Sequence, residues 1–154
     1  MPSGRTHAEI TLAAAGLTYA WGIYSGDPPF LAAAAAGGCV SGVLFNPDLD
    51  VIGTRADRFF RDLGMIPAIL WGLLWYPYST LIPHRSILSH GLIMGTLIRI
   101  AYIMVPLYLL GLRIIPAPEI GRAAVGLLIA DNLHIGADYL LTGLTDLLTW
   151  LIKK

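Results

Sequence analysis

The sequence has few charged residues and only one cysteine, and each shortage excludes a class of protein. Charged residues make up 13% of the 154 residues, roughly half the share found in a typical soluble domain. Positive and negative side chains balance, so the net charge favours neither a nucleic-acid partner nor a polybasic membrane anchor. One thiol, Cys39, can form neither an internal disulfide nor a thiolate zinc site. Any metal ligands must therefore be nitrogen and oxygen atoms.

Apolar residues, by contrast, are abundant and gathered in long runs. They account for 56% of the chain, and the mean hydropathy is +0.68. The runs at residues 10–24, 29–45, 91–112 and 119–135 approach the roughly 20 residues that a helix needs to cross a bilayer. No repeat or linker divides the chain. The pattern therefore predicts one all-α, polytopic membrane domain over residues 1–154.

A fifth apolar run, at residues 65–82, can be assigned in two ways. It contains Pro67 and Pro77 and a cluster of Trp and Tyr, residue types that prefer the membrane–water interface. If the run lies along the interface, seven Lys and Arg residues share one face and two lie on the other. If it crosses, the split is six to three. The positive-inside rule favours about four spans plus an interfacial segment, with both termini cytoplasmic.

Residues 1–24 also have features of a cleavable signal peptide, because Arg5 precedes an apolar run. The Gly26-Asp27-Pro28-Pro29 sequence that follows is a poor cleavage site, since such sites require small residues. We therefore expect this segment to be retained as the first span.

All four histidines stand at predicted helix boundaries. His7 precedes the first span, His84 and His90 precede the third, and His134 ends the fourth. The second span ends in the turn at residues 47–50, which carries two aspartates. In the four-span arrangement these positions converge on one face of the membrane. Ionisable groups at membrane depth are costly, so a functional site is the expected reason for them.

Two acidic motifs have a spacing that suits metal binding. Asp131, His134 and Asp138 stand at i, i+3 and i+7, so they line one face of a helix. Such a His and Asp can share one ion, or the carboxylate can hold the histidine tautomer. In the preceding turn, Asp48 and Asp50 are two residues apart and can face one cation. The alternatives are a water-facing helix pair and two solvated loop acids.

The segment from His84 to His90 is the most unusual of the motifs. A spacing of six positions does not place both histidines on one helix face, and predicts a loop that enters a helix capped near Ser86 or Ser89. Arg85 puts a fixed positive charge where a metal-bound anion can lie. The alternative is a capped interfacial turn that contacts lipid headgroups. Together the motifs use every histidine and share one face, which favours a metal site.

These motifs carry a resemblance to a known family. PSGRTH at residues 2–7, the PDLD turn at 47–50, the HRSxxSH core at 84–90 and the final His134 and Asp138 occur in this order. The chain resembles a bacterial family of small membrane metal-binding proteins akin to inner-membrane metal-dependent hydrolases. The resemblance covers nearly the whole chain and implies an inner-membrane location. It implies a metal site formed by His7, Asp48, Asp50, His84, His90, His134 and Asp138.

Two functions fit this set of residues, with a metal ion and membrane lipids as the partners. The first is a metal-dependent hydrolase that acts on a phosphoester or another ester at the cytoplasmic face, with Arg85 as a catalytic residue that stabilises developing charge. His and Asp ligands suit Zn, Mn or Fe. The second is a non-catalytic structural or transport protein, although ligands at helix ends do not suit a transport path. Metalloprotease His-Glu-x-x-His and serine-hydrolase Gly-x-Ser-x-Gly motifs are missing.

Overall fold

The computed structural model describes residues 4–51, 53–111 and 117–152, and within these ranges the chain is helical with no strand. The expected all-α class is therefore confirmed. In chain order, the elements are α1 (Gly4–Tyr24), α2 (Pro29–Ser41), the 3-10 helix η1 (Pro47–Asp50), α3 (Arg55–Asp62), α4 (Met65–Leu81), α5 (Ile87–His90), α6 (Met94–Leu109) and α7 (Pro118–Ile152).

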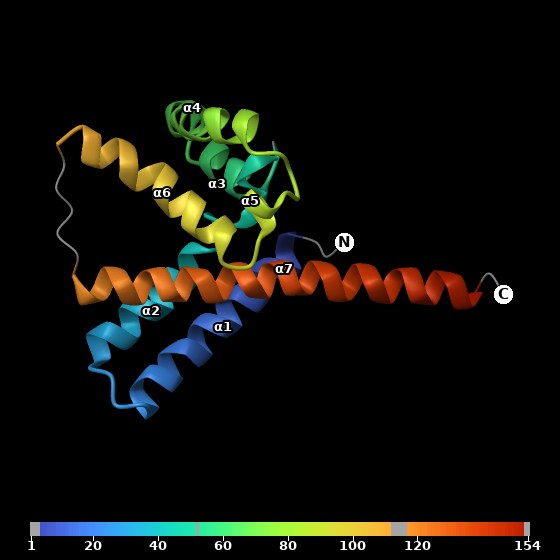
Figure 1. Cartoon of the computed structure of the whole chain (residues 1–154), viewed down its shortest axis with the longest axis horizontal. Helices are drawn as coiled ribbons and strands as arrows, with labels where there is room; N and C mark the ends of the chain where they lie inside the picture. The colour runs from blue at the N-terminus through green and yellow to red at the C-terminus, as the bar shows by residue number, and fades with distance from the viewer. Residues whose placement is uncertain (1–3, 52, 112–116, 153–154) are drawn as a thin grey trace.

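Helix α7 runs along the length of the molecule, with the other helices on two sides of it (Figure 1). The α1–α2 hairpin packs against one side of its first half, and α2 makes the most extensive contact with it. Elements α3 to α6 lie on the other side, while the last turns of α7 extend past both groups (Figure 1). Contact between α6 and α7 and between η1 and α7 is sparse by comparison. The molecule thus consists of two helical units that meet along the middle of α7.

Close packing of α2 on α7 depends on two glycines. A Cβ atom added at Gly38 would lie 1.9 Å from the carbonyl oxygen of Ala123, and one added at Gly126 would lie 1.8 Å from that of Ala35. Both contacts are with backbone atoms, which cannot move aside as a flexible side chain can. Small residues that let helix backbones approach closely are typical of helix pairs in membranes. This contact sets the position of α7 relative to the α1–α2 hairpin.

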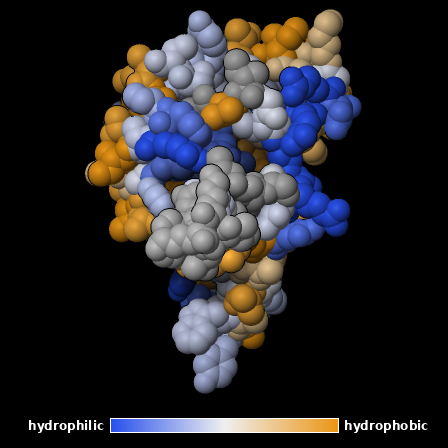
Figure 2. Space-filling model, turned by 90° about the vertical axis from the view of Figure 1, so that its right-hand side faces the viewer, coloured by the Kyte–Doolittle hydropathy of each residue, from blue (hydrophilic) through white to orange (hydrophobic). Residues whose placement is uncertain are grey.

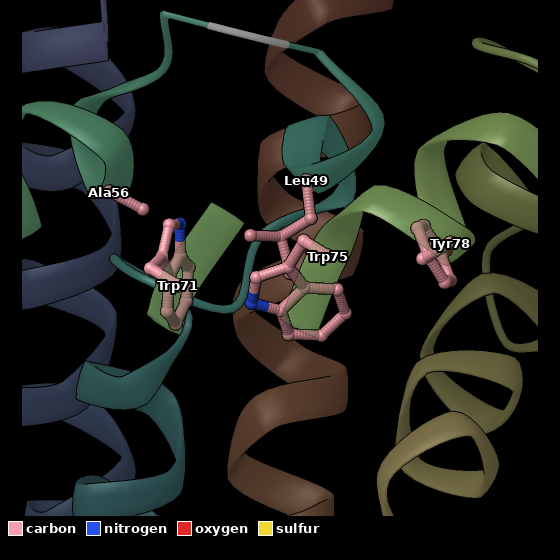
Figure 3. Packing of buried hydrophobic residues seen from close by; sticks show 5 residues of the cluster. All are labelled: Leu49, Ala56, Trp71, Trp75 and Tyr78. Carbon is pink, nitrogen blue, oxygen red and sulfur yellow. The ribbon is translucent and has the colours of Figure 1, made fainter. Parts of the chain in front are cut away.

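An aromatic cluster joins α4 to η1 and α3. Trp71, Trp75 and Tyr78 of α4 pack with Leu49 of η1 and Ala56 of α3. Figure 3 shows the two indole rings on the inner face of α4, with Leu49 above Trp75. The cluster holds η1 in place, and η1 carries the Asp48 carboxylate.

Helix α4 covers the predicted interfacial segment, and its aromatic residues divide between a buried face and an exposed one. Trp71, Trp75 and Tyr78 are only 6%, 4% and 1% exposed, whereas Tyr76 is 65% exposed. Residues three and four apart share one helix face, and the face with these three aromatics is covered by the neighbouring elements. Packing against η1 and α3 accounts for the burial of these three aromatics, and the interfacial position of the segment stays a prediction.

One helix of the described chain is long and apolar enough to cross a bilayer. It is α7 between Pro118 and Thr149, with a hydropathy of 1.2. The apolar helices α2 and α6 have 13 and 16 residues, short of the roughly 20 that a span needs. Helix α7 continues well beyond the predicted span at 119–135 and has 35 residues. Length and composition alone do not establish the four-span arrangement, which stays a prediction.

We expect Gly38→Ala and Gly126→Ala each to destabilise the protein, because the new methyl group overlaps a backbone carbonyl of the facing helix. Overpacking of this kind costs about 1–3 kcal/mol. Gly37→Ala and Gly121→Ala are matched controls on the same two helices, because a Cβ there meets nothing within 4 Å. The controls should be neutral or slightly stabilising. Thermal unfolding followed by circular dichroism measures the difference, and equal melting temperatures for the pairs would contradict the packing.

Candidate metal centre

The predicted ligands lie close together at the start of α1, at η1 and α5, and near the middle of α7. Six of them form two groups of three, and within each group the ligand atoms lie within 4.8 Å of one another. The first group comes from α1 and α7, and the second from η1, the loop that leads into α5, and α5 itself. The groups are His7, His134 and Asp138, and Asp48, His84 and His90.

The first group is buried. His7, His134 and Asp138 are 8%, 4% and 9% exposed. Residues four apart lie one above the other on a helix, so His134 and Asp138 both face the first turn of α1. The His7 and His134 rings stack with their centroids 3.8 Å apart, and His7 Nε2 lies 3.1 Å from Asp138 Oδ1. The stacked rings and the carboxylate form a compact set of donor atoms.

The second group is held by local caps. Asn46 accepts a hydrogen bond from the Asp48 amide at 3.0 Å, which starts η1. Ser86 caps α5 by accepting from the Ser89 amide, as the spacing predicts. The His84 and His90 rings then meet edge to face, with centroids 5.1 Å apart. His84 is exposed, so this group is open to solvent on one side.

Asp48 connects the two groups. Its Oδ1 lies 3.3 Å from His90 Nε2, and its Oδ2 lies 3.3 Å from His134 Nε2. Each oxygen therefore faces a different group. A carboxylate in this position can contribute one oxygen to each of two neighbouring ions.

Several buried atoms at this centre have no hydrogen bond among the described residues. They are His7 Nδ1, His90 Nε2, His134 Nε2 and Asp138 Oδ1. Leaving such an atom unsatisfied costs about 1–3 kcal/mol. Donors bound about 2.1 Å from one ion lie about 3.0–3.4 Å apart, depending on coordination geometry. Three of the nitrogen–oxygen distances here are 3.1 to 3.3 Å, and the distance between His134 Nε2 and Asp138 Oδ2 is 3.8 Å. The donor set therefore fits a transition-metal ion.

Electrostatics favour the protonation states that bind metal. Burial would raise the pKa of the Asp48 carboxyl, but the adjacent His134 and His90 outweigh it and hold that pKa below its usual range. Burial, followed by the charge of the neighbouring His134, lowers the pKa of His7. Metal ligands must be ionised carboxylates and neutral imidazoles, so both directions favour binding.

Asp131 shares the helix face of His134 but does not join the ligands. It forms a buried ion pair with Arg99 of α6 and accepts from Thr96 Oγ1 at 2.6 Å. Arg99 Nη1 also donates to the Ser89 carbonyl at 2.9 Å, and the Ser89 hydroxyl lies 3.0 Å from His90 Nδ1. The pair thus positions His90. The sequence signal that could have predicted this ion pair is the presence of Arg99 and Asp131, two opposite charges, inside two apolar runs.

Two predicted site residues, Arg85 and Asp50, are not members of the two groups. Arg85 is exposed and has a left-handed backbone with φ of 57°. It lines a cavity of about 120 Å³ together with His90 and Asp138. Asp50 is the last residue of η1, and its side chain lies outside the described residues.

A larger cavity, of about 350 Å³, opens beside the ligands. It is lined by five of the six grouped ligands and also by Arg55 and Arg58 of α3. In the sequence these arginines are part of a charged stretch, and nothing local shows that α3 faces the histidines. Figure 2 shows hydrophilic residues gathered on the face from which the C-terminal part of α7 projects.

The chain belongs to the family described as "Uncharacterized metal-binding protein (DUF2227)", whose model matches residues 2–129. The matched range includes His7, Asp48, His84 and His90, and it ends shortly before His134. No curated protein and no solved structure matches the chain. Metal binding, expected from the motifs, is thus a property of the family.

We expect Arg99→Met to destabilise the protein strongly, because it leaves the Asp131 carboxylate buried and unpaired. Breaking a buried ion pair costs about 3–5 kcal/mol. The double variant Arg99→Met/Asp131→Leu should recover much of this loss, since neither charge then remains. Arg122→Met is the control, because its pair with Asp27 is 44% exposed on the arginine side, and such pairs contribute about 0–1 kcal/mol. The unfolding midpoints of these variants measure the differences in stability. A double variant no more stable than Arg99→Met would contradict the prediction.

Proposed function

We propose that this member of a metal-binding family is a metal-dependent hydrolase that cleaves a phosphoester or another ester at the cytoplasmic face of a bacterial inner membrane. The observation that carries the proposal is the Asp48 carboxylate, whose two oxygens face two separate His/Asp groups at 3.3 Å each. A cavity of about 350 Å³ lies beside both groups and leaves room for a substrate.

The ligands divide naturally between two ions. His7, His134 and Asp138 would hold the first ion, His84 and His90 the second, and Asp48 would contribute one oxygen to each. Zn, Mn and Fe all suit such nitrogen and oxygen donors. When bound, paired ions of this kind supply Lewis acidity and lower the pKa of water.

The chain's own residues keep the site rigid and complete it. The His7–His134 stack and the Arg99–Ser89–His90 contacts fix three imidazoles before a metal arrives. Such support from outside the ligand set typically strengthens metal affinity. Arg85 lines the smaller cavity together with His90 and Asp138, and from there it would stabilise negative charge that develops on a substrate held at the ligands.

Exposed apolar side chains support the membrane location. Large hydrophobic residues are more than 70% exposed on at least five helices, including Leu17 of α1, Met65 of α4, Leu109 of α6 and Leu140 of α7. Extensive exposed apolar surface marks contact with lipid or protein. Contact with lipid agrees with the four-span arrangement that we propose from the distribution of basic residues.

A non-catalytic metal-binding protein is the second candidate. One observation favours it: all three residues of the first group are buried, as in structural sites, which fill their coordination with protein ligands. The open side of the second group, at the exposed His84, favours catalysis instead, because catalytic sites keep one position accessible.

The purified protein should contain about two equivalents of a first-row transition metal per chain. His84→Ala/His90→Ala and His7→Ala/His134→Ala should each remove about one equivalent, because each pair belongs to a different group. Asp48→Ala should lower both occupancies. Arg122→Ala, outside the site, should leave the content unchanged. Elemental analysis of the folded variants measures this, and a wild-type metal content in the histidine double variants would refute the ligand assignment.

Metal-loaded protein should hydrolyse at least one member of a panel of phosphomonoesters, phosphodiesters and lipid esters, and a chelator should abolish the activity. Arg85→Ala should lower kcat by about 10²–10³-fold while keeping its metal, because the guanidinium stabilises charge and binds no ion. Loss of metal together with activity would make Arg85 a structural residue. A fully metallated sample with no chelator-sensitive hydrolysis would favour the non-catalytic function.

A further inference from the structure

An apolar groove lies next to the polar cavity of the metal centre. It has a volume of about 620 Å³ and is lined mainly by apolar residues of α4, among them Trp71 and Trp75. Pockets of about 300–1,000 Å³ are large enough to enclose most of a small ligand. Val51 lines both the groove and the polar cavity, so the two spaces adjoin at η1.

Three arginines of α3 follow the border between the two spaces. Arg55, Arg58 and Arg61 are three residues apart and therefore lie along one side of the helix. The first two line the polar cavity and the third lines the groove. All three are exposed, and among the described residues none of them forms an ion pair. Their charge is therefore available to an anion.

One carboxylate of α3 is held in place by neutral hydrogen-bond donors, and among the described residues it forms no ion pair with these arginines. Asp57 accepts hydrogen bonds from the amides of Gly53 and Thr54 and from Trp71 Nε1 at 3.1 Å. These bonds fix the first turn of α3 against α4. The arginines are thus presented from a helix that is anchored at both the loop and the aromatic cluster.

The geometry points to an anionic lipid as the ligand of this protein. Its phosphate occupies the polar cavity between Arg55, Arg58 and the metal ligands, and its acyl chain lies in the groove against Trp71 and Trp75. The α3 arginines complement a phosphate at one end of a ligand, and the apolar groove complements a long hydrocarbon chain at the other end. A water-soluble phosphoester would leave the groove unfilled. This inference rests on the proposed function and names its substrate class.

The two groove tryptophans provide a direct readout. In the full-length variant Trp21→Phe/Trp150→Phe, fluorescence comes only from Trp71 and Trp75, since the chain has four tryptophans. The probes are phosphatidic acid and phosphatidylcholine with identical brominated acyl chains, titrated into metal-loaded protein in neutral detergent. Bromine quenches indole at contact. Phosphatidic acid should quench at an about tenfold lower concentration, which corresponds to about 1.4 kcal/mol.

Variants of the arginines distinguish recognition of the phosphatidic acid headgroup from general binding to lipid. Arg55→Gln/Arg58→Gln should abolish the preference for phosphatidic acid, while Arg122→Gln, outside both cavities, should retain it. Glycerol phosphate should compete poorly, because it lacks the chain. No quenching, equal quenching by both lipids, an unchanged preference in the double variant, or strong competition by glycerol phosphate would each overturn the inference.

Metal analysis of the same samples distinguishes a failure of the lipid inference from a failure of the proposed function. A protein that binds its metal but shows no headgroup preference would disprove the lipid inference alone. A protein without metal that still prefers phosphatidic acid would disprove the metal-dependent function and leave the lipid site standing.

Discussion

The buried ion pair between Arg99 and Asp131 is the interaction on which the arrangement of the molecule depends. The α1–α2–α7 unit is tightly packed through small residues, but α6 touches α7 only sparsely. Arg99 bridges that junction and also holds the Ser89 carbonyl beside His90. Burying these two charges is favourable only while they stay together. The pair therefore fixes the relative position of the two units and orients the second ligand group at the same time.

The two groups of ligands correspond to the two helical units of the fold. One group belongs entirely to α1 and α7, and the other to η1, α5 and the loop between α4 and α5. Asp48 reaches across, from η1 to His134. A metal bound at this junction would cross-link two units that share few other contacts, so metal binding and tertiary stability are coupled. The same junction opens into the cavity, which explains how a buried set of ligands can remain accessible from one side.

Local patterns in the sequence predicted much of the chemistry. Apolar runs predicted an all-α chain, and the position of the histidines at helix boundaries predicted that they would gather. The Ser86 cap of α5 also follows from its spacing, because a cap requires only neighbouring residues. The aromatic residues of α4 did not predict their packing against η1 and α3, since clustering along the chain does not reveal which elements a helix face will contact. Whether the helices span a membrane remains a proposal, because helix length and composition cannot establish it.

What the sequence by itself determined is therefore the type of each element and the kind of donor atoms available for a metal. Periodicity and residue type carry that information, and both are local. Only the tertiary structure decided that Asp131 pairs with Arg99 rather than joining His134, that Asp48 lies between the two groups, and that Arg55 and Arg58 face the histidines. These relationships depend on the angles at which distant helices pack. Such angles arise from contacts like that of Gly38 with α7, which no single segment encodes.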